Sequence, residues 1–235
     1  MEKTSRMTTK FSCEFCKREY VKEISLINHS CEKKQRWFAK DEAYSRTAFI
    51  AWNRFHELNT PSRKTNPPNA YKDFIDSQYY NGFIKFGKHI RDIGAIEPAK
   101  FIDYVIKNNL PLDKWTNEFV YEQYVRELTK QETPDNALMR NIMLMKEWHM
   151  QTGELWYDFF RKVNTNQAMS WIKNGRLSPW VIYNVDSANE FFIRCTTEQV
   201  NMITKYAPIG LWKLKFDKDQ ESCDFIRTTL QDSGM

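Results

Sequence analysis

Four potential metal ligands lie within nineteen residues near the N-terminus, and no other feature limits the fold of this chain as strongly. These ligands are Cys13, Cys16, His29 and Cys31. The same stretch has three apolar residues placed to form a core, namely Phe11, Tyr20 and Leu26. So small a core cannot fold by its own burial. A bound metal would supply the missing free energy, on the order of 10–16 kcal/mol in comparable peptides, so the spacing predicts a zinc module.

Residues 11–29 read aromatic-x-Cys-x2-Cys-x3-aromatic-x5-Leu-x2-His. This pattern resembles the zinc-finger family whose ligands are two cysteines and two histidines. The resemblance implies a ββα module, with Cys13 and Cys16 on a β-hairpin and His29 on a helix over residues 22–29. It also implies that zinc is the cofactor.

The fourth ligand departs from that pattern, because Ser30 alone separates His29 from Cys31. Two residues of continuous helix turn through about 200°, which would point the two side chains apart. Cys31 can bind the same zinc only if the helix ends at or just before His29. The alternative is that Glu32, His56 or another group completes the site.

The excess positive charge of the chain lies around this motif. Residues 1–40 hold ten Lys or Arg and five Glu, whereas residues 41–235 sum to zero. A local basic segment is typical of proteins that bind a polyanion. We therefore expect DNA or RNA as a partner; the simpler interpretation is a well-solvated terminus.

In DNA-reading fingers of this family, helix positions −1, 3 and 6 face the bases. With Leu26 as position 4, these correspond to Lys22, Ser25 and Asn28. Lysine can pair with guanine and asparagine with adenine. The other cations that we expect to contact phosphates are Lys17, Arg18, Lys33, Lys34 and Arg36.

The rest of the chain predicts a mainly α fold. A zinc finger with basic flanks over residues 1–36 precedes a multi-helix, aromatic-rich domain over 37–235, with a possible break at 60–69. Apolar periodicity and capping signals predict the helices 37–58, 70–93, 98–108, 116–131, 134–151, 154–162, 165–174, 179–192, 196–206 and 218–231.

Three local expectations accompany these helices. Thr116 is a possible N-cap, and the alternation over 211–216 predicts a short strand. The aromatic stripe of helix 70–93 is interleaved with basic residues. It could stack single-stranded bases, but such a stripe is more often core.

No catalytic pattern stands out. The chain has no Walker-type loop, no G-x-S-x-G and no H-E-x-x-H, so we expect no enzymatic activity and no catalytic residue. Dispersed carboxylates keep a metal-dependent nuclease as a third hypothesis. The five cysteines, the lack of a signal-peptide pattern and the lack of a long apolar run predict an intracellular, cytoplasmic protein with no membrane partner.

A second resemblance concerns the helical part. Residues 101–110, 121–128 and 217–227 are similar to segments of the all-helical helicase-loading proteins of T-even-like bacteriophages. The resemblance implies a replication accessory protein whose partner is a helicase, polymerase or single-strand-binding protein. The leading hypothesis is therefore a zinc-containing nucleic-acid-binding accessory protein of phage replication, recombination or transcription. The alternative is a protein-interaction adaptor with a purely structural finger.

Overall fold

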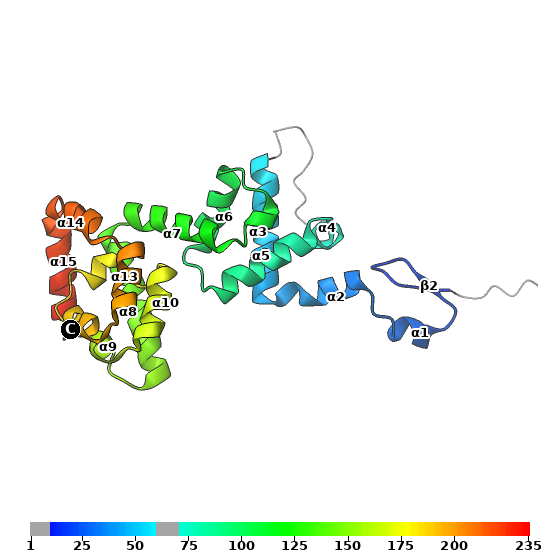
Figure 1. The fold of residues 1–235 in the computed structure, drawn as a ribbon. Helices are drawn as coiled ribbons and strands as arrows, with labels where there is room; N and C mark the ends of the chain where they lie inside the picture. Colours follow the sequence, from blue (N-terminus) through cyan, green and yellow to red (C-terminus); the bar gives the residue numbers. More distant parts are fainter. Residues whose placement is uncertain (1–9, 60–70) are drawn as a thin grey trace, which may run out of the picture. The chain divides into compact units, whose positions relative to one another are not determined.

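A computed structural model describes residues 10–59 and 71–235 of the chain. The described chain is mainly α-helical, with one two-stranded antiparallel sheet near its N-terminus (Figure 1). The elements are β1 (Phe11–Ser12), β2 (Glu19–Tyr20), α1 (Glu23–Ile27), α2 (Glu32–Phe38), η1 (Ala39–Asp41), α3 (Ala43–Asn59), α4 (Tyr71–Asp76), α5 (Tyr80–Asp92), α6 (Pro98–Lys107), η2 (Leu112–Lys114), α7 (Glu118–Gln131), α8 (Pro134–Thr152), η3 (Trp156–Asp158), α9 (Phe159–Lys162), α10 (Thr165–Lys173), α11 (Pro179–Ile182), α12 (Ala188–Arg194), α13 (Thr197–Tyr206), α14 (Ile209–Asp217) and α15 (Gln220–Gln231). The predicted fold class, a small ββα module followed by many helices, is confirmed.

The chain divides into two compact units. Unit 1 comprises residues 1–92 and 102–116, and unit 2 comprises residues 93–101 and 117–235. The division passes through α6. The predicted domain boundary after residue 36 stays a prediction, and the predicted break at 60–69 lies outside the described residues.

The core of unit 1 is built on large rings. Phe83 and Phe86 of α5 are buried and meet the buried ring of Trp115 edge-on, with ring centroids 5.6 and 5.0 Å from its own. Edge-to-face pairs at this separation are favourable beyond the area that they bury. The aromatic stripe predicted over 70–93 is therefore mostly core, as its spacing favoured, although Tyr79 beside the break between α4 and α5 is 48% exposed.

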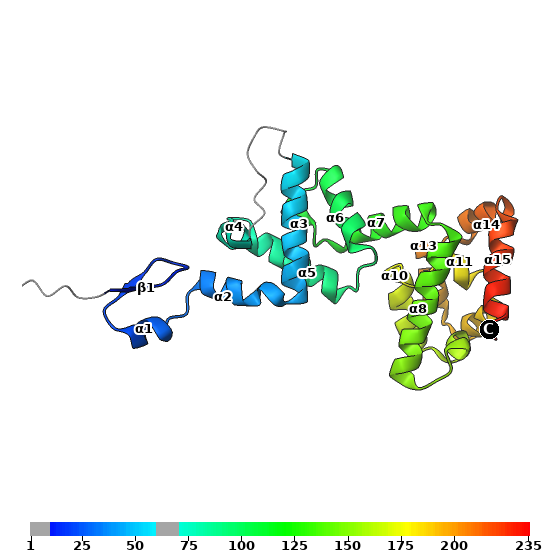
Figure 2. The ribbon, with the colours of Figure 1, turned by 180° about the vertical axis from the view of Figure 1, so that it is seen from behind.

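Gly87 sets the approach of α5 to α3. A Cβ atom at this position would overlap the backbone carbonyl oxygen of Tyr44 in α3. Only glycine therefore permits the two helices to lie this close. Figures 1 and 2 both show α3 and α5 side by side.

We expect Gly87→Ala to destabilise unit 1 by about 2 kcal/mol or more, because overpacking against backbone outweighs the better helix propensity of alanine. Gly210→Ala in α14 is the matched control, since no atom lies within 4 Å of a Cβ there. It should be neutral or stabilise by up to about 1 kcal/mol. Urea unfolding of the two variants checks this, and equal midpoints would contradict it.

Unit 2 has a larger core that is arranged around α8. This helix packs against α9, α11 and α15 (Figures 1 and 2). Its Trp148 is buried and meets Phe159 edge-on at 5.4 Å. Both ends of α8 carry capping signals: the Thr133 hydroxyl accepts from the backbone N–H of Asn136, and Gly153 adopts a left-handed φ of 76°.

Other predicted boundaries are wrong, and at Ser77 and Asn117 the reason is that a polar side chain bonds to a backbone group. Helix 70–93 is broken into α4 and α5 at Ser77, whose hydroxyl accepts from the N–H of Tyr79 at 3.1 Å. Helix 179–192 is likewise divided into α11 and α12. The N-cap of α7 is Asn117, not Thr116, because the Asn117 side chain accepts from the N–H of Phe119. Helix 37–58 is interrupted by η1.

The strand predicted over 211–216 is also wrong, because these residues form most of the helix α14. In a helix, Trp212 and Phe216 are four residues apart and share one face. Both rings pack on Trp180, with centroids 5.9 and 5.1 Å from its ring. That packing outweighs the local alternation of apolar and basic residues.

Candidate metal centre

A tight knuckle between β1 and β2 carries the first two cysteines. The N–H of Cys13 donates to the carbonyl of Arg18, and the N–H of Lys17 donates to the carbonyl of Cys13, both at 2.9 Å. Lys17 adopts a left-handed φ of 59°, which reverses the chain directly after Cys16. The two thiols are thereby presented from one turn, as the Cys-x2-Cys spacing predicts.

The helix that follows is shorter than predicted. It ends at Ile27, and Asn28 caps it by donating its N–H to the carbonyl of Ile24 at 3.0 Å. Cys31 lies before α2 in an extended conformation, with φ −112° and ψ 161°. The condition for Cys31 to share a metal with His29, a helix that ends before the histidine, is therefore met.

The four side chains converge on one point. The ligand atoms of Cys13, Cys16, His29 and Cys31 all lie within 4.8 Å of one another. Cys13 Sγ lies 4.0 Å from Cys31 Sγ, and Cys16 Sγ lies 3.2 Å from His29 Nε2. These residues are close enough to hold one metal ion.

The other candidates for the fourth ligand have different contacts. Glu32 forms an ion pair with Arg36 on the next turn of α2. The His56 ring packs edge-on against Trp52 in α3, with centroids 4.8 Å apart. Among the described residues, Cys31 is the one that the fold brings to the other three ligands.

The surroundings shift the pKa values of two thiols, Cys13 and Cys31, in opposite directions. Hydrogen bonding from the backbone N–H of Cys16, and next from that of Phe15, lowers the pKa of Cys13 against the effect of its burial. Burial raises the pKa of Cys31. Because the thiolate is the form that binds a metal, Cys31 would have to release its proton to act as a ligand.

Five of the polar residues predicted to contact nucleic acid are exposed on the finger. Lys17 and Arg18 lie on the knuckle, and the Arg18 guanidinium carbon is 5.7 Å from the centre of the Tyr20 ring. Lys22, Ser25 and Asn28 lie on α1 or directly at its ends, and α1 begins at the residue that corresponds to helix position 1. The geometry thus leaves these five side chains available to a partner.

Lys33 and Lys34 make contacts within the chain. The Lys33 ammonium lies 2.7 Å from a carboxylate oxygen of Asp76 in α4. Lys34 donates to the backbone carbonyl of His29 at 3.1 Å. Lys34 thereby holds the segment that carries a potential ligand.

Arg36 contributes to the packing of α2. It donates to the backbone carbonyl of Ile75 at 2.6 Å, pairs with Glu32, and lies 4.2 Å from the centre of the Tyr80 ring. Its side chain is mostly buried. The neighbouring Trp37 is packed rather than open, with ring centroids 6.1 Å from Phe15 and 6.0 Å from Tyr71.

One feature of the finger was missed at the level of sequence. Val21, Ile24 and Ile27 are three residues apart, and each is more than half exposed. Ile24 and Ile27 lie in α1 and share one helix face, whereas Val21 lies just before the helix, next to its N-cap Lys22. The spacing itself was the available signal, and it marks an apolar stripe beside the polar positions of α1.

No helix in residues 10–59 or 71–235 has both the length and the apolar character needed to cross a membrane. No protein-family model matches the chain, and comparisons with curated proteins and with solved structures give no significant match.

Proposed function

We propose that this chain is a zinc-containing nucleic-acid-binding accessory protein. In this proposal the finger and the rest of unit 1 contact DNA or RNA, and unit 2 docks a protein partner. No residue is assigned a catalytic role. A helicase, polymerase or single-strand-binding protein as the partner, and a setting in a bacteriophage, stay predictions from the resemblance.

The donor set supports zinc as the metal. In a tetrahedral site with Zn–S of about 2.3 Å and Zn–N of about 2.0 Å, two sulfurs lie about 3.8 Å apart and a sulfur and a nitrogen about 3.5 Å apart. The distances of 4.0 Å between Cys13 and Cys31 and 3.2 Å between Cys16 and His29 are close to these values. Three thiolates and one imidazole form a closed structural site, because no position is left for water.

The observation that carries nucleic-acid binding is the exposed charge on this module. Lys17, Arg18 and Lys22 form no ion pair with another residue in the described part of the chain. Unit 1 has 20 Lys or Arg and 13 Asp or Glu, a formal charge of +7, whereas unit 2 has 15 and 17, a charge of −2. A polyanion would therefore be attracted to unit 1.

We expect the purified protein to bind duplex, forked or single-stranded DNA, or RNA, at low salt. Log K should fall linearly with log salt, at about −0.9 per neutralised phosphate on duplex DNA. Lys17→Glu and Lys22→Glu should each weaken binding and reduce that slope by about 1. Fluorescence anisotropy across a salt titration measures both quantities.

Lys146→Glu is the matched control. Lys146 is exposed on α8 of unit 2, and its substitution changes the net charge by the same amount as Lys17→Glu or Lys22→Glu. It should leave the slope unchanged. Binding to none of these nucleic acids at low salt would refute the proposal. Equal weakening by Lys146→Glu would show that net charge matters and the finger does not.

A protein-interaction adaptor is the second candidate, and the apolar stripe of Val21, Ile24 and Ile27 favours it. An exposed group of branched apolar side chains is typical of a surface that contacts protein. This candidate requires zinc for folding but predicts no salt-dependent affinity for nucleic acid. The salt titration therefore separates the two functions.

A further inference from the structure

The helix α14 has apolar side chains on more of its circumference than its packing covers. Trp212 is buried, but Ile209, Leu211 and Leu214 are 54, 41 and 65% exposed. A helix that has large apolar residues outside its packed face is normally covered on a second side as well. Unit 2 packs against the face of α14 that carries Trp212 and Phe216, so Leu214 on the opposite side, and Ile209 at the first turn of the helix, stay exposed among the described residues of this unit.

The inner side of α14 is firmly held. Trp212 and Phe216 pack on the buried ring of Trp180. The Lys215 ammonium lies 4.8 Å from the ring centre of Trp180 and donates to the carbonyl of Lys130 at 2.9 Å. The helix also packs beside α15 (Figures 1 and 2). The exposed apolar residues therefore project from a fixed support.

Two hollows flank this helix, and Trp212 contributes to both. The larger has a volume of about 310 Å³ and includes Tyr183, Ile209, Phe216, Cys223 and Arg227 among its lining residues. The smaller has a volume of about 100 Å³ and is lined in part by Tyr206, Pro208 and Leu211. Each hollow could receive apolar side chains of a bound segment.

The rims of these hollows are basic. Arg126, Lys130 and Lys205 line the smaller hollow, which has no acidic lining residue. Lys213 and Arg227 line the larger hollow, together with the single acid Asp217.

Few of these cations are neutralised by residues that the structure describes. Arg227 pairs with Asp224 at 2.7 Å, and Lys205 approaches Glu122 at 3.8 Å. Arg126, Lys130 and Lys213 form no ion pair with another described residue, and the buried Nε of Arg126 has no hydrogen-bond partner among them. Although unit 2 as a whole is slightly acidic, this one surface favours an anionic ligand.

We propose that α14 and its two flanking hollows dock an acidic amphipathic segment of a partner protein. The apolar side chains of that segment would enter the hollows, and its carboxylates would face Lys213, Lys205 and Lys130. This inference locates the partner-docking part of the proposed function. It does not depend on nucleic-acid binding by the finger.

Two other occupants fit the surface less well. A second copy related by a two-fold axis would bring the same basic rim against itself, and like charges in contact disfavour association. A nucleic acid would satisfy the cations, but its phosphates gain nothing from Ile209, Leu211 and Leu214. The apolar centre and the basic rim are satisfied together by a peptide that carries both carboxylates and large apolar residues.

The test uses the full-length protein and a short fluorescein-labelled peptide with Leu and Phe at helical spacings of three and four and Asp or Glu elsewhere. A second peptide has Lys in place of each acid. We expect the acidic peptide to bind and the basic one to fail. Leu214→Asp and Lys213→Glu should each weaken binding about tenfold or more, as central interface residues do.

Matched controls come from exposed positions elsewhere in unit 2. Ile193→Asp in α12 makes the same change as Leu214→Asp at a residue that is 83% exposed, and Lys146→Glu matches Lys213→Glu. Both should leave peptide binding unchanged. Thermal unfolding of all four variants identifies any loss of binding that comes from misfolding, and Lys213→Glu keeps the test decisive if Leu214→Asp misfolds.

Several outcomes would overturn the inference. These are no binding of the acidic peptide to the unaltered protein, equal binding of the basic peptide, or equal effects of Leu214→Asp and Ile193→Asp. A dimer in sedimentation that Leu214→Asp dissociates would assign the surface to a second copy. Loss of DNA binding in Lys213→Glu would assign it to nucleic acid. Failure of the finger to bind nucleic acid would refute only the other part of the proposed function.

Discussion

Removal of the metal is expected to unfold residues 11–31 while the helices of both units stay folded. The finger buries only Cys13 fully, and its remaining core side chains are half-buried. A bound metal would therefore supply its folding free energy, on the order of 10–16 kcal/mol in comparable peptides. Elemental analysis should give about one zinc per chain, since a closed Cys3His set holds one ion. Chelation should expose the finger to trypsin at Lys17, Arg18 and Lys22 with little change in helical circular dichroism.

Single substitutions show which thiols hold the metal. Cys13→Ser and Cys31→Ser should each release the metal or weaken its binding strongly, because a serine hydroxyl is not a comparable ligand for zinc. Cys195→Ser is the matched control, because this half-buried thiol lies outside the set and donates to the carbonyl of Phe191 at 3.4 Å, as a serine can. A Cys13→Ser protein that keeps its full metal content would show that these residues do not form the centre. If only Cys31→Ser keeps its metal, the fourth ligand lies elsewhere.

The convergence of the ligands could be predicted because it depends mostly on local chain geometry. Cys13 and Cys16 share one turn, and His29 follows at a spacing that a compact ββα module brings back to that turn. The place of Cys31 depended on the residue at which α1 ends. Periodicity could not fix that point, because Asn28 is compatible with both the helix and its end.

The surfaces could not be predicted as well, since they depend on contacts between distant residues. Arg36 is as basic in the sequence as Lys22, but it donates to the carbonyl of Ile75, 39 residues away, so most of its side chain is removed from solvent. The exposed side of α14 was missed for a related reason. Alternating apolar and basic residues are typical of a strand. The contact that favours a helix here is made by Trp180, which lies 32 residues before Trp212 in the chain and packs on one helical face.

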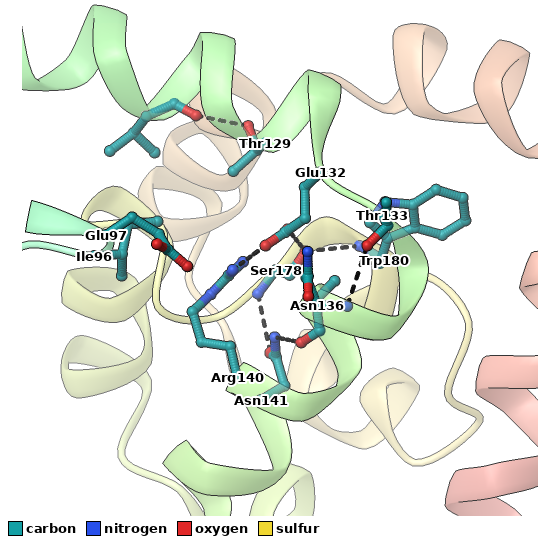
Figure 3. Close-up of polar contacts among 12 residues, drawn as sticks. Ile96, Glu97, Thr129, Glu132, Thr133, Asn136, Arg140, Asn141, Ser178 and Trp180 are labelled. Atoms are coloured by element: carbon teal, nitrogen blue, oxygen red, sulfur yellow. Dashed lines mark hydrogen bonds and ion pairs between the residues drawn. The ribbon is translucent and has the colours of Figure 1, made fainter. Parts of the chain in front are cut away.

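A buried polar network at the corner between α7 and α8 was equally invisible in the sequence (Figure 3). The Glu132 side chain is only 4% exposed and pairs with both terminal nitrogens of Arg140, one of them at 2.8 Å. The hydroxyl of Ser178 donates to Glu132 at 3.3 Å, and its N–H donates to Asn141 at 3.0 Å. The network therefore ties the start of α11 to a corner of the chain 46 residues earlier.

We expect Glu132→Gln to destabilise unit 2 by about 3 kcal/mol. Removing one partner of a buried ion pair costs about 3–5 kcal/mol because a buried charge is left unpaired. The lower end applies here, since the Arg140 side chain is 18% exposed and keeps some contact with water. Urea unfolding followed by circular dichroism measures the loss, and the slope of the transition should stay unchanged if the fold is kept.

An exposed pair and a double variant separate the effect of burial from that of charge. Glu154→Gln removes an ion-pair partner of Lys162. The Glu154 side chain is 44% exposed, so this substitution should lower the free energy of unfolding by no more than about 1 kcal/mol. Glu132→Leu combined with Arg140→Met leaves no buried charge, and should recover much of the stability lost in Glu132→Gln because apolar replacement of a buried pair is often neutral. If Glu132→Gln and Glu154→Gln cost the same, the corner is held by the packing of α7 and α8 and not by its ion pair. If the double variant is less stable than Glu132→Gln, the bonds from Ser178 and Arg140 contribute more than the buried charge costs.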